Sequence, residues 1–151
     1  MEAVFKAWKA SRKLYLNFFD NYSLDQLNKI PNGFNNNLIW NIGHIIVAQQ
    51  SLIYKDSNLP MSISDDIVNL YKPETKPTRK TSQDEADELK KLLISLILKT
   101  ETDFSKGVFT TYNERTTRTG FHLSSIIDAF EFNNYHEGLH LGYMMSMRKF
   151  V

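Results

Sequence analysis

Four long segments of the chain repeat apolar side chains at helical spacing, and they cover about residues 2–20, 37–55, 82–104 and 125–149. Residues three and four positions apart lie on the same face of an α-helix, so each segment predicts a helix with an apolar face. The second segment carries apolar residues on nearly every face, which predicts the most deeply packed helix of the set. The pattern therefore predicts one all-α domain over residues 1–151, folded as a four-helix bundle.

Polar residues at the segment ends support these boundaries. Asn37 is a suitable N-cap for the second helix. Ser82 with Glu85 has the spacing of a capping box at the start of the third, and Ser125 with Asp128 has it at the start of the fourth. The connection over residues 56–80 holds three prolines and is long enough to cross the bundle, which would make the second and third helices parallel. Residues 105–121 are rich in Thr and Gly and predict a loop or a short hairpin.

Composition narrows the classes of function. Cysteine is absent, which excludes disulfides, thiolate metal ligands and a cysteine nucleophile. The 18 Lys and Arg residues against 17 Asp and Glu residues give a net charge of +1, and the charges are mixed, so no nucleic-acid surface is indicated. The N-terminus lacks a signal-peptide pattern and no apolar run could span a bilayer. We therefore expect a cytoplasmic protein without a membrane partner.

The placement of the histidines suggests chemistry. His136 and His140 stand four positions apart on the predicted last helix, so their rings lie on one face and can bind one ion. His44 lies among apolar neighbours on the second helix. A buried imidazole needs partners for its nitrogens; a backbone carbonyl would serve for one ring alone, whereas a metal ion serves three that converge. We therefore predict that these three bind a divalent transition metal, whereas His122, at a loop end, fits a surface or capping role.

The same segment contains a rival motif. Residues 136–140 read H-E-x-x-H, the helix motif of zinc peptidases, in which the Glu, here Glu137, acts as general base. The extended form of the motif fails, because Tyr143 and Ser146 stand at its remaining positions, and only 11 residues follow His140. The third ligand must then come from upstream. Glu137 remains a candidate base, or an acceptor for an imidazole N–H, or a residue without a role in chemistry.

Two segments resemble signatures of a known family. The stretch with Trp40 and His44 is similar to the W-x-x-x-H-[IL] pattern of the DinB-like (YfiT-like) superfamily, and His136 and His140 with Gly142 resemble its H-x-x-x-H-x-G pattern. The resemblance implies an up-down-down-up bundle with a long crossover between helices 2 and 3. It also implies a three-histidine site for nickel, zinc or a similar ion, and a homodimer. Relatives include thiol-dependent S-transferases, isomerases and proteins labelled metal-dependent hydrolases.

The chain departs from the family pattern beside the last ligand. Members often carry Arg before the glycine of the second motif and Gln after it, where this chain has Leu141 and Tyr143. The departure leaves the ligands in place and bears on contacts around them. We expect Trp40, Asn41, Tyr135 and Tyr143 to line the pocket.

Three classes of function follow from the sequence. The first is a metal-dependent enzyme acting on a small-molecule substrate, a hydrolase or a thiol-dependent S-transferase that uses a low-molecular-weight thiol. The second is a zinc endopeptidase that uses Glu137. The third is a non-catalytic metal-binding or interaction bundle. Imidazole ligands suit zinc, nickel, copper or iron better than magnesium or calcium. The resemblance implies nickel, zinc or a similar ion, and on that ground Ni or Zn is the expected ion.

Overall fold

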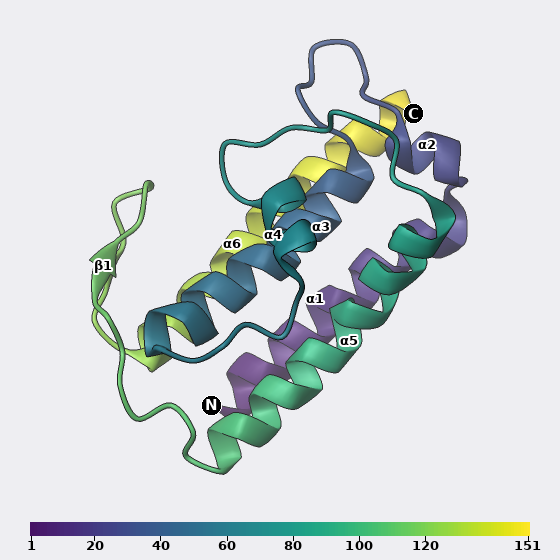
Figure 1. Cartoon of the computed structure of the whole chain (residues 1–151). Helices are drawn as coiled ribbons and strands as arrows, with labels where there is room; N and C mark the ends of the chain where they lie inside the picture. Colours follow the sequence, from purple (N-terminus) through teal and green to yellow (C-terminus); the bar gives the residue numbers. More distant parts are fainter.

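A computed structural model describes all residues, 1–151. Its four long helices are those that the periodicity predicts, and they assemble as an all-α bundle (Figure 1). The elements in chain order are α1 Glu2–Asn21, α2 Leu24–Asn28, α3 Leu38–Gln49, a π-helical turn Gln50–Tyr54, a 3-10 turn Lys55–Ser57, α4 Asp65–Tyr71, α5 Gln83–Ser105, β1 Arg115–Thr116, β2 His122–Leu123, α6 Ile126–Met147 and a 3-10 turn Arg148–Phe150.

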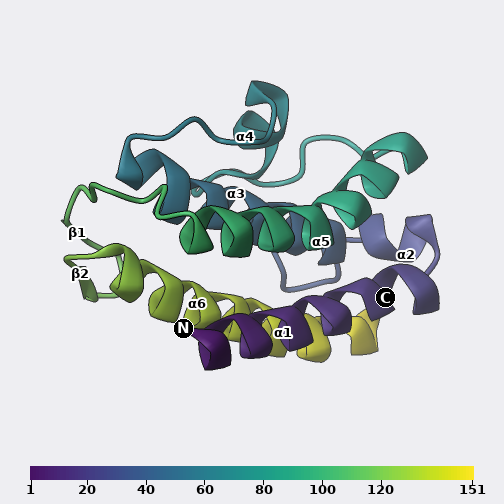
Figure 2. The ribbon, with the colours of Figure 1, turned by 90° about the horizontal axis from the view of Figure 1, so that it is seen from below.

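The helices run up, down, down and up. Helices α1 and α6 point one way, and α3 and α5 point the other way (Figure 1). Two surface ion pairs show that α1 and α5 are antiparallel. Lys9, near the start of α1, pairs with Glu101, near the end of α5, and Asp20, near the end of α1, pairs with Lys90, in the first half of α5. Each of α1 and α3 packs on both α5 and α6 (Figure 2). The topology confirms the parallel second and third helices that the long connection indicated.

The helix starts are held by the caps that the sequence indicated. The Asn37 side chain accepts a hydrogen bond of 2.9 Å from the backbone N–H of Trp40 at the start of α3. Ser82 and Glu85 form the expected capping box at α5, and the Ser125 hydroxyl accepts from the backbone N–H of Asp128 at α6. These bonds satisfy backbone donors that the first turn of a helix leaves without partners.

The long connection contains a helix that the pattern had not predicted. Helix α4, Asp65–Tyr71, lies within the segment expected to be a plain crossover, and it packs against α3. Its start carries a sequence signal, because the Ser64 side chain accepts from the backbone N–H of Ile67 and two acidic residues occupy the first turn.

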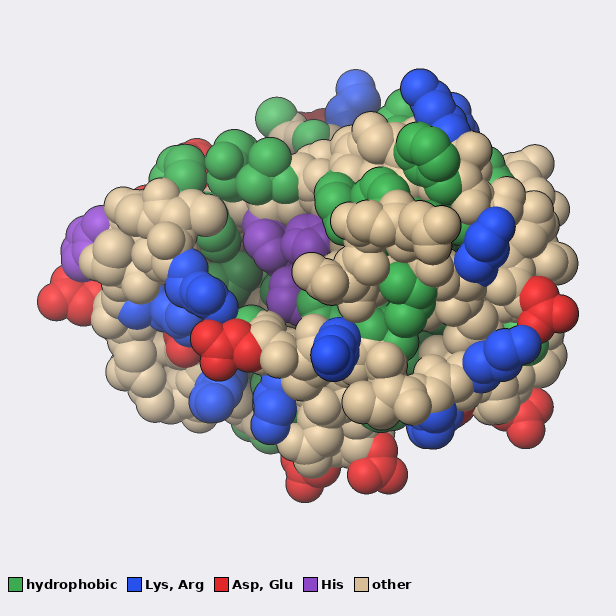
Figure 3. Space-filling model, turned by 90° about the horizontal axis from the view of Figure 1, so that it is seen from above, with side chains coloured by type: hydrophobic (Ala, Val, Ile, Leu, Met, Phe, Trp, Pro, Cys, Tyr) green, Lys and Arg blue, Asp and Glu red, His purple; other side chains and the backbone are tan.

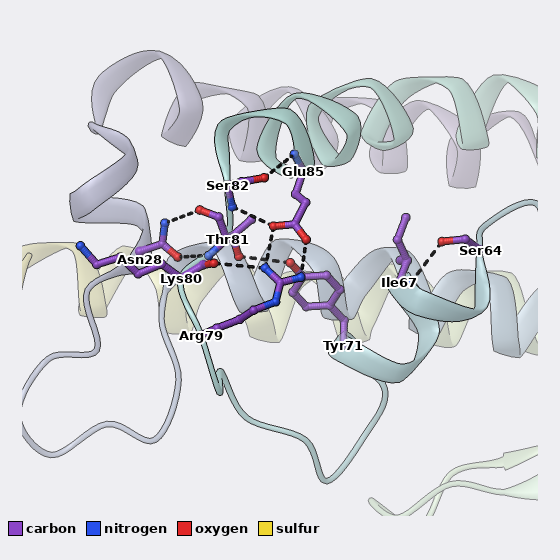
Figure 4. A network of polar contacts seen from close by, with 9 residues as sticks. All are labelled: Asn28, Ser64, Ile67, Tyr71, Arg79, Lys80, Thr81, Ser82 and Glu85. Atoms are coloured by element: carbon purple, nitrogen blue, oxygen red, sulfur yellow. Dashed lines mark hydrogen bonds and ion pairs between the residues drawn. The ribbon is translucent and has the colours of Figure 1, made fainter.

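A polar network fixes the end of this connection to the bundle (Figure 4). The Asn28 amide exchanges hydrogen bonds of 2.7 and 3.0 Å with the backbone of Thr81. The hydroxyls of Tyr71 and Thr81 lie 3.3 Å apart. Because Tyr71 is the last residue of α4, this network fixes the place where α4 ends against α3.

The same network contains an ion pair with a pH-dependent contribution to stability. The Arg79 guanidinium donates to both carboxylate oxygens of Glu85, which also accept from the Ser82 backbone, and these contacts lower the pKa of Glu85 to about 2. A carboxyl whose pKa is lower in the folded state stabilises the fold above its unfolded pKa, about 4.3, and loses that contribution as the pH falls toward 2.

We expect Arg79→Met to lower the free energy of unfolding by about 0.5–1 kcal/mol at pH 7, a small value because the pair is partly exposed and screened by solvent. Urea unfolding at pH 7 and near pH 2 measures the difference between variant and parent, which should shrink toward zero at the lower pH. Lys80→Met, which breaks a more exposed pair with Asp25, is the control and should change little. An equal effect of Arg79→Met at both pH values would contradict the assignment.

The segment before the last helix forms the short hairpin that was one of its two expected forms. Strands β1 and β2 pair antiparallel, with Arg115 opposite Leu123 and Thr116 opposite His122. His122 is exposed, as expected, and its ring lies 3.7 Å from the carboxylate of Glu114. The hairpin lies beside the start of α6 and the end of α3 (Figure 1). None of the helices combines the length and apolar character that a membrane span requires.

The apolar core follows the axis of the bundle in two clusters. One lies among α1, α3, α5 and α6 and includes Tyr15, Leu38, Ile42, Leu93 and Met144. The other lies nearer the hairpin end and includes Phe5, Trp8, Ile53, Ile97 and Phe130. Helix α3 is buried along its whole length, as its continuous apolar pattern predicted.

Candidate metal centre

Three histidines converge between α3 and α6. His136 and His140 stand one turn apart on α6, with ring centroids 4.6 Å apart, and His44 faces them from α3 at 5.4 and 4.8 Å. One ligand nitrogen from each ring lies within 4.8 Å of the others. Nitrogens bound to one tetrahedral zinc ion at about 2.0–2.1 Å stand roughly 3.3 Å apart, so small ring rotations bring this set to a single ion.

His44 is held in a defined orientation. Its Nδ1 lies 2.8 Å from the backbone carbonyl oxygen of Tyr71, which cannot donate, so Nδ1 carries the proton. The Trp40 indole stacks on the ring at 4.8 Å with an interplanar angle of 9°. The lone pair of Nε2 is therefore left for a ligand, because the hydrogen bond at one ring nitrogen fixes the role of the other.

His140 is oriented in the same manner by a side chain. Its Nδ1 lies 2.8 Å from Oδ1 of Asn41, a residue that is fully buried. The Asn41 amide nitrogen donates to the Asn37 carbonyl at 2.7 Å and to Asn36 at 3.1 Å, which turns its oxygen toward the ring. Nδ1 of His140 is thus the donor and Nε2 is free to bind a metal.

His136 has a nitrogen without a partner. Its Nδ1 is buried and makes no hydrogen bond, and Phe132 stacks against the ring at 6.0 Å. A buried polar atom without a partner carries a desolvation penalty of about 1–3 kcal/mol. A ligand bound at Nδ1 itself, which the protein does not supply, would remove that penalty, and a metal ion is one such ligand.

The electrostatics keep all three rings neutral. Burial lowers the pKa of His44 below its ordinary value. Burial, with the neighbouring His44 adding to it, lowers the pKa of His136 to about 4. Burial, followed by the effects of the other two histidines, lowers the pKa of His140 to about 3. Neutral imidazoles are the form that binds metal, so the set is ready to bind at neutral pH without losing protons. The donor set fits a divalent transition metal.

A glycine makes the contact between α4 and α3 close enough for this arrangement. A Cβ atom added to Gly43 would lie 2.4 Å from ring carbons of Tyr71. The absent side chain lets Tyr71 lie directly on α3, where its carbonyl reaches His44. The glycine that precedes the ligand in the sequence therefore has a packing reason to be there.

Of the three roles that the sequence left open for Glu137, the contacts of its side chain favour the one without a part in the chemistry of the histidines. Its fully buried carboxylate accepts from Trp8 at 2.8 Å and from Arg12 at 2.8 and 2.7 Å, which corrects the expected roles as a base or as an acceptor for an imidazole N–H. Asn133 donates a further bond of 2.9 Å. The carboxylate faces α1 and is saturated with donors, so it is an anchor of the bundle and is not available as a general base.

A cavity of about 540 Å³ opens beside the three histidines. His44 and His136 line it together with residues of the α3 end, the α4 end, the hairpin and α6. Figure 3 shows a group of histidine atoms within a hollow of the surface, with apolar atoms beside it and Lys or Arg side chains at the margin. The volume lies in the range of small-molecule sites, about 300–1,000 Å³.

The four residues expected to line the pocket have different places. Trp40 lines the cavity, and its indole N–H donates to the Thr75 hydroxyl at 3.2 Å. Asn41 and Tyr143 line a separate, shallower hollow beside His140. Tyr135 lies in neither, since it is 45% exposed and packs on Phe121 and on the side of Phe132, which corrects that expectation.

Sequence reasoning missed the groups that orient the ligands. The acceptor for His44 is the backbone carbonyl of Tyr71, and the identity of a residue does not predict which backbone carbonyl will accept such a bond. Its position would have followed from α4, whose Ser64 cap and acidic first turn are visible in the sequence. Lys72 and the hairpin residues Arg115 and Arg118 also line the cavity, and their scattered positions in the chain carry no local pattern.

Comparison with known families identifies the superfamily to which the chain belongs. Residues 7–144 match the DinB superfamily. The match covers nearly the whole chain, and the chain belongs to this superfamily. A search of curated proteins returned no match.

Proposed function

We propose that the chain is a metal-dependent enzyme that uses His44, His136 and His140 to bind one divalent transition metal, Ni or Zn, for hydrolysis or thiol-dependent transfer on a small molecule. The observation that carries the proposal is the pair of hydrogen bonds from His44 to Tyr71 and from His140 to Asn41, which leave both Nε2 atoms free in one converging cluster. A structural ion would have no need of an adjoining cavity of about 540 Å³.

A bound ion of this class supplies Lewis acidity and lowers the pKa of a water or thiol that it binds. The protein's own residues do the rest. Asn41 and the Tyr71 carbonyl hold two of the rings in their binding orientation. Trp40 and Phe132 shield the centre and provide apolar surface for the substrate. Glu74 is the one carboxylate on the cavity wall, and its side chain is well exposed.

Metal content tests the proposal directly. In protein prepared without a His tag and supplied with Zn or Ni, we expect about one ion per chain by elemental analysis. His136→Ala should lose most of it, because a three-ligand site becomes a two-ligand site. His122→Ala is the matched control, since His122 is exposed and lies on the hairpin, and it should keep the ion. A metal-replete sample without an ion, or full loading of His136→Ala, would refute the metal centre.

The class of reaction needs a second measurement on the same preparation. A panel of low-molecular-weight thiols with electrophilic substrates, run beside ester and amide substrates, separates transfer from hydrolysis. Activity that depends on an added thiol supports transfer, and activity without one supports hydrolysis. Whichever activity is found should disappear in His136→Ala and persist in His122→Ala.

The peptidase alternative has less support. It needs the Glu137 carboxylate beside the ion, whereas that carboxylate is fully buried and bonded to Trp8, Arg12 and Asn133. The non-catalytic bundle stays open to the metal analysis above. The homodimer, the small-molecule substrate and the cytoplasmic location stay predictions.

A further inference from the structure

The cavity beside the histidines has an apolar floor and a charged rim. Apolar surface comes from Trp40, Val47, Leu52, Met61, Val68 and Phe132. The charged side chains are four basic ones, Lys55, Lys72, Arg115 and Arg118, against a single acidic one, Glu74. The whole chain is nearly balanced at +1, so the basic excess of this wall is a local property.

Ion pairs neutralise only part of that excess. Arg115 pairs with Asp56 at 3.2 Å, and Arg118 pairs with Glu74 at 3.0 Å across the mouth of the cavity. The Lys72 ammonium bonds only a neutral partner, the Asn69 side chain at 3.1 Å. The Arg118–Glu74 pair is 78% and 77% exposed, so it contributes little and can be exchanged for another anion.

Lys72 is also close to the metal centre along the chain. It directly follows Tyr71, whose carbonyl holds His44, and both Lys72 and His44 line the cavity. Lys55 lies eleven residues beyond His44 on the α3 side, roughly 16 Å along a helical path, and is therefore more remote. An anion bound at Lys72 would place the remainder of the molecule against the apolar floor beside the histidines.

We propose that this cavity binds a small amphiphilic anion, with its carboxylate or phosphate on Lys72 and Arg118 and its apolar body along Trp40, Val47 and Phe132. The proposal specifies the substrate class for the metal-dependent activity proposed above and rests on it for the location of the reacting group. Binding itself does not require the ion, so the two can be tested separately. The carboxylate and the phosphate share one chemistry, and the experiment distinguishes them.

The test is isothermal titration of the full-length, metal-free protein with octanoate, octyl phosphate and the neutral octanamide. We expect the better anion to bind about tenfold or more tightly than octanamide, because a hydrogen bond to a charged group is worth about one order of magnitude. The tighter of the two anions identifies the headgroup. The preference should fall by about half an order of magnitude in Lys72→Met, and the anion and octanamide should approach equal affinity when Arg118→Met is added. Both replaced side chains are exposed, so the fold should be unaffected.

Lys13→Met is the matched control, because it removes one exposed Lys from α1, away from the cavity, and should keep the full preference. Using metal-free protein excludes direct ligation of the anion by an ion. The same titration on His136→Ala separates this proposal from the metal centre: a retained preference for anions supports the anion site even if the metal centre fails. Equal affinity for octanoate, octyl phosphate and octanamide, or an unchanged preference in Lys72→Met, would overturn it.

Discussion

Truncating Glu137 to Ala is expected to lower the free energy of unfolding by about 3–5 kcal/mol, because the change leaves a fully buried Arg12 guanidinium without its counter-charge. Two oxygens of Glu137 accept from Arg12, and one of them also accepts from Trp8 and Asn133. The truncation therefore removes the acceptor for several donors that have no access to water. Chemical unfolding monitored by circular dichroism measures the loss.

A second variant separates the buried charge from a general packing defect. Replacing both partners by apolar residues, Arg12→Met with Glu137→Leu, removes the unpaired charge and should recover a large part of the lost stability, since buried ion pairs are often replaceable as a unit. If Glu137 were instead a catalytic base, Glu137→Ala would be as stable as the parent protein and would lose only activity. A destabilisation under about 1 kcal/mol would contradict the structural role.

The alternatives left open for Glu137 show what the position of a residue around a helix can and cannot predict. The angle between Glu137 and His140 around α6 is fixed by the helix, but the helix that packs at that angle is a property of the whole bundle. The chain did carry a usable signal. Arg12 stands within the apolar stripe of the first helix and Glu137 within an apolar last helix, and a buried charge requires a partner of opposite sign.

Local rules predicted the elements well because their causes are local. The capping residues Asn37, Ser82 and Ser125 act within one turn, and apolar spacing directs the faces of the long helices to a common core. The convergence of His44 with His136 and His140 also followed, since all three occupy positions that face a neighbouring helix. The cavity could not be predicted in this way, because its wall is formed by four separate elements and tertiary packing determines how they lie against one another.

Replacing Gly43 at the contact between α4 and α3 is expected to lower both the stability of the protein and its affinity for metal. Gly43→Ala places a Cβ atom only 2.4 Å from the nearest ring carbons of Tyr71, which is too close for atoms that are not bonded. Overpacking of this kind costs about 1–3 kcal/mol, whereas Gly→Ala within a helix ordinarily stabilises by about 1 kcal/mol. Displacing Tyr71 also disturbs the carbonyl that orients His44, so metal affinity should fall about 10–100-fold. Thermal unfolding and competitive metal titration measure the two effects.

The opposite signs of two glycine replacements make this test decisive. Gly138 lies inside α6 with nothing within 4 Å of an added Cβ, so Gly138→Ala should stabilise the protein by about 0.5–1 kcal/mol. Adding Tyr71→Ala to Gly43→Ala removes the clashing ring while keeping a backbone carbonyl at position 71, and should restore part of the metal affinity. If Gly43→Ala stabilised the protein as Gly138→Ala does, the close approach of Tyr71 would have no part in holding His44, and the hydrogen bond at Nδ1 would need another support.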